Sequence, residues 1–476
     1  MTSNRPLNLL AMSSQPVAVS APGKVLFAGG FLVLDRKHTG LVFGLDARIH
    51  VHIESWSGPP VPPTLKGGGA QILVQSPQFS EAKWLYEISE GGGEHAAVNV
   101  SQVQDQAGST AGSNKFVETT LRYALTYLSH TIKDVYQSLK VTILADDDYY
   151  SQSGGSSRPQ DARSDFTHFG VKLTEAHKTG LGSSAALVTA LVGALLAFYG
   201  ANSQGDSEEA AHLRRTHNLA QAAHCAAQGK VGSGFDVAAA VFGSCLYRRF
   251  SPAILETVGE PASVGFAERL HVCVDDLDLK HAWDQEVARQ AVQVPTSLLL
   301  LMCDVDCGSE TPGMVRKVLQ WRKEKAEESS ILWNALQQGQ EELCQELRRL
   351  AEKEGIASDG YQELGDIIST IRSLVREMST ASTVPIEPPV ITELLDFCTA
   401  LPGVVGGVAP GAGGYDALAL LVKNDVEAVR DLQYSLEGWK SKDASVATVG
   451  KVRLLGVKQE KQGVRAESVG RYSGWL

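Results

Sequence analysis

The sequence predicts an α+β protein with two domains, the first rich in strands and the second rich in helices. Strand patterns with alternating apolar residues occur early in the chain, most clearly over residues 45–53. The longest apolar run, over 185–199, indicates a buried helix near the middle. Amphipathic helical patterns then cover about 314–353 and 361–380. This change from strands to helices places a domain boundary near residues 285–300.

Composition narrows the classes of partner. The 476 residues carry a formal net charge of −11 without a basic run, which argues against nucleic acid or an anionic membrane as main partner. Seven cysteines without a Cys-x-x-Cys pair indicate buried, reduced thiols. No targeting signal and no apolar run of membrane-spanning length is visible, so we expect a cytoplasmic protein. The predicted segments are a flexible tail over 1–15, a first domain over 16–290 and a second domain over 291–476.

In the first half, short strands and one helix are separated by polar insertions. Residues 17–30 contain a short strand that Ala21-Pro-Gly-Lys24 breaks, and 141–144 form another. Helical spacing covers 116–132. Three polar stretches are expected to be surface loops or disordered insertions, and they lie near 56–70, 101–114 and 150–166.

After the central apolar run, helices alternate with glycine-rich breaks. Residues 207–228 are expected to form a helix and 298–303 a buried strand. The stretch 308–313 breaks the chain before the long helices. Residues 403–422 are typical of a strand, a glycine-rich turn and a second strand.

A glycine- and serine-rich turn leads into the central helix. In Gly180-Leu-Gly-Ser-Ser184, the glycines let the backbone approach a ligand and the hydroxyls can donate to phosphate or coordinate magnesium. The first N–H groups of a helix lack partners within it, and the helix dipole favours an anion there. The pattern therefore favours a phosphate site, the alternative being a serine that merely caps the helix. It is not a Walker A motif.

Two charged residues could serve such a site. Lys24 follows a Pro-Gly corner in an apolar strand, where it is either a surface lysine with a buried stem or a cation aimed into a cleft. Asp236 follows Gly232-Ser-Gly-Phe, where it is either a helix N-cap or a carboxylate that orients Lys24 or acts as a base. His224 and Cys225 are expected to be packed rather than metal-binding, and His50 with His52 suggests no third ligand.

Three motifs in this order resemble the GHMP kinase superfamily: Pro22-Gly-Lys24, Gly180-Leu-Gly-Ser-Ser-Ala185 and Pro410-Gly-Ala-Gly-Gly414. Within it, the chain is most similar to phosphomevalonate kinases of the fungal type, over most of 17–425. The stretches that carry this finer similarity are 20–24, 28–35, 178–185, 217–236, 247–250, 308–311 and 410–416.

The resemblance implies a fold and a reaction. The fold is an N-terminal α/β domain of the ribosomal S5 domain 2-like type packed on a ferredoxin-like α+β domain. The reaction is ATP- and Mg²⁺-dependent phosphorylation of (R)-5-phosphomevalonate to (R)-5-diphosphomevalonate, in the mevalonate pathway to isoprenoids and sterols, by a monomer or homodimer. The alternatives are a sister kinase of the mevalonate kinase type and a non-catalytic nucleotide-dependent regulator.

The resemblance also implies site residues. Lys24 and Asp236 would be catalytic. ATP would be bound by Lys178, Thr179, Gly180, Leu181, Gly182, Ser183, Ser184, Ala185, Ala186 and Leu187. The substrate would be bound by Ser20, Lys24, Gly232, Ser233, Ser309, Thr311, Gly411, Ala412 and Gly413. The basic residues considered for the substrate's charged ends are Lys178, Lys230, Arg48 and Arg248.

One departure from the mevalonate kinase pattern bears on the metal and the mechanism. The glutamate that helps to hold magnesium there lies eleven residues before the aspartate, where this chain has Cys225. Ser184 (or Ser183) and the ATP phosphates are then the expected magnesium contacts. A phosphate acceptor has a second pKa of about 6 and needs little deprotonation at neutral pH. Lys24 is therefore expected to be the main catalytic residue and Asp236 an orienting one.

Overall fold

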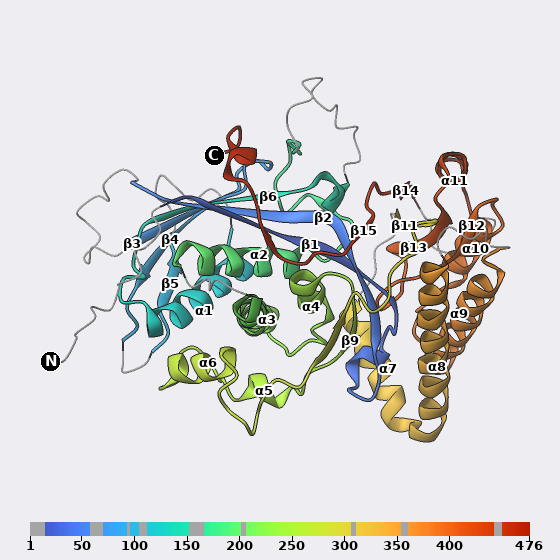
Figure 1. Ribbon diagram of the computed structural model, residues 1–476, viewed down its shortest axis with the longest axis horizontal. Coiled ribbons are helices and arrows are strands. Elements are labelled where there is room, and N and C mark those ends of the chain that lie inside the picture. Colours follow the sequence, from blue (N-terminus) through green and yellow to red (C-terminus); the bar gives the residue numbers. More distant parts are fainter. Residues whose placement is uncertain are drawn as a thin grey trace.

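The computed structural model describes residues 15–57, 70–92, 96–103, 112–151, 166–200, 206–305, 311–353, 360–441 and 450–476 (Figure 1). Most of the predicted tail and most of the three polar insertions lie outside these ranges. The side chains of residues 206–208 and 311–312 also lie outside the description.

A large mixed sheet forms the first part of the molecule. Its strands are β1 (Val17–Ala28), β2 (Gly40–Ser55), β3 (Ala70–Gln75), β4 (Lys83–Ser89), β5 (Asn99–Gln102), β6 (Leu139–Ala145), β9 (Cys245–Arg248) and β10 (Glu286–Arg289). Its order is β10-β9-β2-β6-β3-β4-β5, with β1 antiparallel to β2 and β3 parallel to β6. The strands predicted over 45–53 and 141–144 are thereby confirmed, and the strand predicted within 17–30 ends at Ala28.

Strand β1 is continuous, so the predicted break at Ala21-Pro-Gly-Lys24 is wrong. The strand instead shifts its register against β2 between Pro22 and Gly23. Proline has no N–H to donate to a ladder, and an irregularity of the bulge type accommodates it without ending the strand.

Helices cover one face of this sheet. They are α1 (Lys115–Thr131), α2 (Ser183–Phe198), α3 (Asp206–Gln228), α4 (Phe235–Phe242), α5 (Ala253–Glu256) and α6 (Phe266–Val274) (Figure 1). Helix α2 packs on β1 and β2 and is flanked by α1, α3 and α4. This explains why its sequence is apolar on every side, because almost every side chain after Ser184 is buried. The helices predicted over 116–132 and 207–228 are confirmed.

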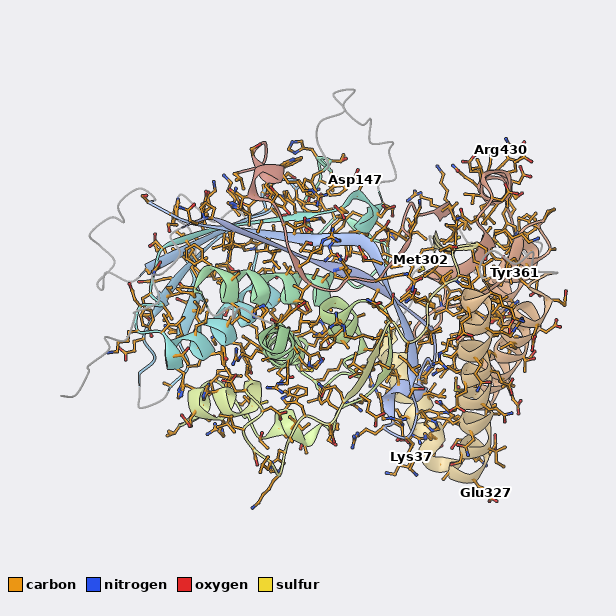
Figure 2. All side chains as sticks on the ribbon, viewed as in Figure 1. Lys37, Asp147, Met302, Glu327, Tyr361 and Arg430 are labelled. Atoms are coloured by element: carbon orange, nitrogen blue, oxygen red, sulfur yellow. The ribbon has the colours of Figure 1, made fainter. Side chains whose placement is uncertain are left out.

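The second part is a smaller antiparallel sheet with its own helices. The strands are β11 (Leu298–Val305), β12 (Val404–Val408), β13 (Ala417–Lys423) and β14 (Val452–Leu454), in the order β12-β13-β11-β14. The helices are α7 (Thr311–Glu324), α8 (Ala326–Glu352), α9 (Gln362–Ser382), α10 (Pro389–Thr399) and α11 (Val426–Glu437). Figure 2 shows side chains filling the space between α8 and β1–β2. The predictions over 298–303, 361–380 and 403–422 are confirmed.

The helix expected over about 314–353 is two helices. Lys325 leaves helical geometry, with φ −121° and ψ 52°, and separates α7 from α8. Lysine is a good helix former, so nothing in the local sequence marks this break.

Residues 450–476, which we call the C-terminal strap, join the two sheets. Strand β14 pairs with β11, whereas β15 (Gln459–Glu460) pairs with β2 and β16 (Arg465–Ala466) pairs with β1. Residues 459–460 and 465–466 therefore belong to the first sheet, although we expected all of 291–476 to lie in the second domain. Strands of two residues carry no periodicity, and only long-range pairing defines them.

The strap is held by a buried polar cluster and by close backbone packing. Arg48, 2% exposed, donates to Ser20 Oγ at 2.7 Å and to the Gly463 carbonyl at 2.5 Å. Ser20 in turn donates to Glu467 at 2.7 Å. The Val464 N–H donates to the Val241 carbonyl at 3.2 Å, which joins the strap to the end of α4.

The cysteines and the helix lengths agree with the composition of the chain. The cysteines among the described residues are all buried and free, as expected, while Cys307 lies outside the description. Among the helices that the structure describes, none is long and apolar enough to cross a bilayer.

Gly463 allows the strap to lie against α4, which leads to a stability prediction. A Cβ at Gly463 would overlap the Val241 carbonyl, whereas a Cβ at Gly474 would meet nothing within 4 Å. We expect Gly463→Ala to lower the free energy of unfolding by about 1–3 kcal/mol. The matched variant Gly474→Ala should stay within about 0.5 kcal/mol of the parent chain. Urea unfolding measures both, and equal midpoints for the two variants would contradict this account of the strap.

Candidate active site

The turn before α2 has the backbone of an anion site. Gly180 and Gly182 have φ of 75° and 83°, in the left-handed region that favours glycine. Gly182 occupies the N-cap, so Ser183 and Ser184 lie in the first helical turn. The alternative that a serine merely caps this helix is therefore wrong. The two hydroxyls and the first N–H groups of α2 lie together at the positive end of the helix dipole.

Lys24 reaches this turn from β1. Its backbone N–H donates to the Leu181 carbonyl at 2.9 Å, and its Nζ lies 3.4 Å from the Gly180 carbonyl oxygen. Nζ also lies 5.6 Å from the centre of the Phe235 ring, within the range of a cation–π contact. Burial lowers the pKa of Lys24, and the nearby charge of Asp236 partly opposes this.

Gly182 has no side chain, and this leaves room for the side chain of Lys24. A Cβ at Gly182 would lie 2.8 Å from Lys24 Cε, closer than real side chains approach. A Cβ at Gly180 would meet nothing within 4 Å. The lysine stem therefore packs directly on the backbone of the turn, and it is not an ordinary surface lysine.

Asp236 lies at the start of α4, opposite Lys24. The N-cap of α4 is Gly234, with φ 84°, so the alternative that Asp236 is the cap is wrong. Asp236 Oδ1 accepts from the Val237 N–H at 3.0 Å, and its side chain is 23% exposed. The preceding loop is fixed because Tyr247 donates to the Ser233 carbonyl at 2.9 Å and Arg249 to the Gly232 carbonyl at 2.8 Å.

His224, on α3, lies between the two helix starts. Its Nε2 is 3.2 Å from Ser184 Oγ, 3.3 Å from Gln228 Nε2 and 3.8 Å from Asp236 Oδ2. Its side chain is only 2% exposed. From the sequence we expected a packed histidine, and its contact with the turn was not predicted. The available signal was its place beside Cys225, the position of the metal-binding glutamate in mevalonate kinases.

An apolar cavity of about 100 Å³ opens beside the serines. Lys178, Ser183, Ser184 and Leu187 line it at the turn. Aromatic and aliphatic side chains form the rest of its wall, including Phe79, Trp84, Phe116, Ile143 and Tyr150. The other predicted ATP residues are buried under the turn: Leu181, Ala185 and Ala186 are in the core, and Thr179 donates to the Asp148 carbonyl at 2.6 Å.

The third glycine-rich motif comes from the second part and lies on β1. It links β12 to β13, and the Gly411 N–H donates to the Leu26 carbonyl at 2.9 Å, two residues beyond Lys24. A Cβ at Gly30 would overlap the Gly411 carbonyl, so the close approach of the two segments requires glycine at position 30. This brings Gly411, Ala412 and Gly413 to the strand that carries Lys24.

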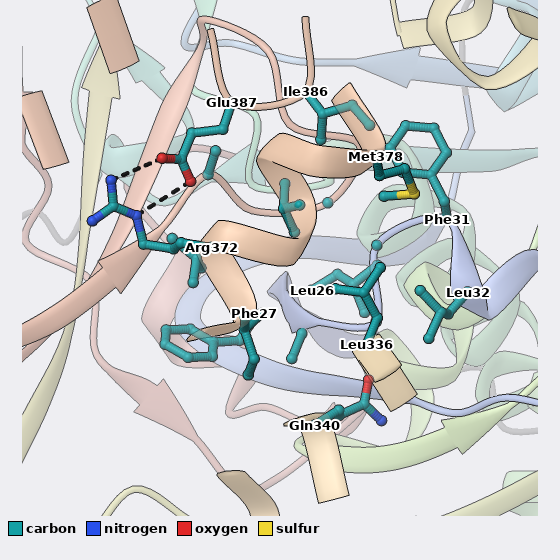
Figure 3. A pocket seen from close by; sticks show the side chains of 18 residues that line it. Leu26, Phe27, Phe31, Leu32, Leu336, Gln340, Arg372, Met378, Ile386 and Glu387 are labelled. Carbon is teal, nitrogen blue, oxygen red and sulfur yellow. Dashed lines mark hydrogen bonds and ion pairs between the residues drawn. The ribbon is translucent and has the colours of Figure 1, made fainter. Parts of the chain in front are cut away.

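Behind this loop, the two parts of the molecule are packed together. A cavity of about 40 Å³ lies between β1, α8 and α9, and its wall is largely apolar (Figure 3). On one side of it, Arg372 Nη2 and Glu387 Oε1 form a buried ion pair at 2.8 Å. This packing fixes the loop of Gly411 relative to Lys24.

Several residues that we considered for substrate binding make contacts elsewhere in the structure. Arg48 and Ser20 hold the strap, and Arg248 pairs with Glu286 at 2.9 Å. Lys230 is exposed and lines a separate cavity of about 450 Å³. Ser309 and the side chain of Thr311 lie outside the described residues.

Whether the site suits a magnesium ion depends on the ligand atoms that it offers. Hard cations such as Mg²⁺ prefer oxygen ligands and are usually held by few side chains together with substrate phosphates. Ser184 Oγ, at the anion-binding turn, is a donor of this kind, so the residues fit the ion.

Comparison with known proteins identifies the family. Residues 167–244 match the GHMP kinases N terminal domain family. The chain is 48% identical to a phosphomevalonate kinase of Aspergillus fumigatus, with 98% of this chain and 100% of the relative covered. It is 47% identical to a phosphomevalonate kinase of Gibberella zeae, with the same coverage of both chains.

A solved structure shows the same fold. It is the phosphomevalonate kinase of Streptococcus pneumoniae in complex with phosphomevalonate and AMPPNP, with a TM-score of 0.56, 16% identity and coverage of 88% of this chain and 95% of that one. The α+β GHMP kinase fold expected from the sequence is thereby confirmed. From the near-complete match to its curated relatives, the chain belongs to the phosphomevalonate kinase family of the GHMP kinases.

Proposed function

We propose that this chain transfers the γ-phosphoryl group of ATP to (R)-5-phosphomevalonate, giving (R)-5-diphosphomevalonate and ADP in the mevalonate pathway. The observation that carries the chemistry is the packing of Lys24 on the Gly180–Ser184 turn, with Asp236 opposite. The acceptor follows from the relatives that the chain matches over almost its whole length, all of them phosphomevalonate kinases.

The turn before α2 binds the ATP phosphates. Its N–H groups and hydroxyls supply donors, and Lys24 supplies the positive charge. We expect the apolar cavity beside Ser183 and Ser184 to receive the adenine base, which would stack on its aromatic wall. Ser184 and the phosphates would hold Mg²⁺, which neutralises the charge that develops on the transferred group.

The acceptor phosphate approaches from the side of α4 and the loop of Gly411. Both reactants are anions, so the main barrier that the protein must lower is their repulsion at reacting distance. Lys24 lies where its charge can offset this repulsion. Asp236 supports the charge of Lys24 and orients the substrate, while the half-buried Ser233 and Ala412 offer further contacts on the acceptor side.

The first test compares acceptors. ADP release should occur with 5-phosphomevalonate and not with mevalonate, ATP and Mg²⁺ being present. We expect Lys24→Ala to lower kcat by roughly 10²–10³-fold, because one preorganised cation is lost. Lys172→Ala is the matched control, since that lysine is 49% exposed and pairs with Glu81 on the surface. Turnover of mevalonate would favour the sister kinase, and ATP binding without turnover of either acceptor would favour the regulator.

Alanine variants at Gly182 and Gly180 distinguish the effect of backbone strain on activity from the effect of displacing Lys24. Alanine at either position is strained because φ is positive, at a cost of about 1–2 kcal/mol in stability. Only Gly182→Ala also pushes Lys24 out of place, and we expect its kcat to fall by roughly 100-fold. Steady-state kinetics should show a much smaller fall in kcat for Gly180→Ala, and equal losses would mean that the contact with Lys24 is unimportant.

The role of Asp236 can be tested through pH. Lys24 must be protonated to act, and the charge of Asp236 raises the pKa of Lys24 against the effect of burial. Asp236→Asn removes this support, so the pKa of Lys24 falls further. The alkaline limb of kcat/KM against pH should therefore move to lower pH. Loss of the acid limb instead, with a fall in kcat as large as that of Lys24→Ala, would identify Asp236 as a general base.

A further inference from the structure

We propose that His224 is a positioning residue that turns the Ser184 hydroxyl so that its oxygen faces the magnesium ion of bound ATP. This inference rests on the proposed function, which places the ATP phosphates at the turn before α2. It assigns the cation to Ser184 rather than to Ser183, and it gives a task to a histidine that the mechanism above does not use.

The contacts of one ring nitrogen decide the direction of the hydrogen bonds. Gln228 Nε2 lies 3.3 Å from His224 Nε2, and an amide NH₂ group only donates. The ring nitrogen is therefore an acceptor without a proton of its own. Ser184 Oγ lies 3.2 Å from the same nitrogen, so the hydroxyl is the donor in this contact, and it shares the single lone pair of Nε2 with the Gln228 amide.

Asp236 makes no hydrogen bond to His224 that would contradict this assignment. Its Oδ2 lies 3.8 Å from His224 Nε2, too far for a hydrogen bond from a protonated nitrogen. The ring is held in place by burial, at 2% exposure, and by the Phe116 ring, whose centre is 5.7 Å away. A single orientation of the imidazole is thus fixed by packing before any ligand arrives.

The consequence concerns the lone pairs of Ser184. A hydroxyl that gives its proton to His224 cannot donate it to a phosphate oxygen, and both of its lone pairs remain for a cation. Residues that orient a metal ligand in this way typically change metal affinity by 10–100-fold when they are replaced. His224 would therefore act on magnesium through Ser184, without touching the ion.

Two amide substitutions separate this role from simple packing. The amide of His224→Gln reaches the position of Nε2 and can accept from Ser184, whereas the shorter His224→Asn reaches only the position of Nδ1. Calorimetry of ATP binding, with Mg²⁺ and with EDTA, measures how much the metal tightens binding. We expect the factor by which Mg²⁺ tightens ATP binding to fall roughly tenfold or more in His224→Asn. In His224→Gln this factor should stay close to that of the parent chain.

A control and two outcomes make the test decisive. His217 is a fully buried histidine on the same helix that packs against Phe242 and Trp283, and His217→Asn should leave the tightening by Mg²⁺ unchanged. If Mg²⁺ tightens ATP binding equally in His224→Asn and in the parent chain, or if both His224 variants lose the same amount of this tightening, the role of His224 is overturned. Either result leaves the proposed function standing. A parent chain that binds no ATP would overturn both the role of His224 and the proposed function.

Discussion

The candidate site depends on the direct contact between the Lys24 side chain and the backbone of the turn before α2. The contact exists because Gly182 has no Cβ and because the Lys24 N–H donates to Leu181. The contact joins β1 to the N-terminus of α2. The same packing therefore fixes the positions of the Lys24 ammonium group and of the first N–H groups of the helix. The apolar helix α2 makes this possible, since its burial under β1 and β2 fixes its N-terminus rigidly.

Strand β1 organises the rest of the molecule around this contact. Gly411 of the second part donates to Leu26, two residues along from Lys24, and Arg465 of the strap pairs with Ser20, four residues before it. The strap also contacts the end of α4, the helix that begins beside Asp236. One strand thus contacts the turn before α2, the loop of Gly411 and the C-terminal strap, although these segments are far apart in sequence.

The sequence predicted what depends on neighbouring residues. The helices around 116–132 and 207–228, the buried helix after Gly182 and the two glycine turns follow from periodicity and from glycine conformations, which are local properties. It failed where distant partners decide the outcome. Strands β15 and β16 are too short to show a pattern, and Lys325 ends a helix without a local signal.

The same reasoning explains which charged residues were misplaced. Arg48 and Lys24 both lie on apolar strands, and composition cannot tell them apart. Arg48 is neutralised because Glu460 and Glu467 of the strap lie within 4.0 Å of it, and those carboxylates are more than four hundred residues away in sequence. His224 was likewise taken as a core residue. It is buried, but the approach of α2 and α4 to the same face of α3 makes it part of the site.

The distribution of charge bears on how an acidic protein brings two anions together. With a net charge of −11, the chain as a whole repels both ATP and a phosphorylated acceptor. Attraction must therefore be local, and Arg48 and Arg248 are already paired with carboxylates. Lys24 has Asp236 as its charged neighbour, and Asp236 stays partly exposed rather than forming a closed ion pair with it. Burial lowers the pKa of Lys24 and the charge of Asp236 opposes this, so the carboxylate supports the charged form of the lysine without closing it off from phosphate.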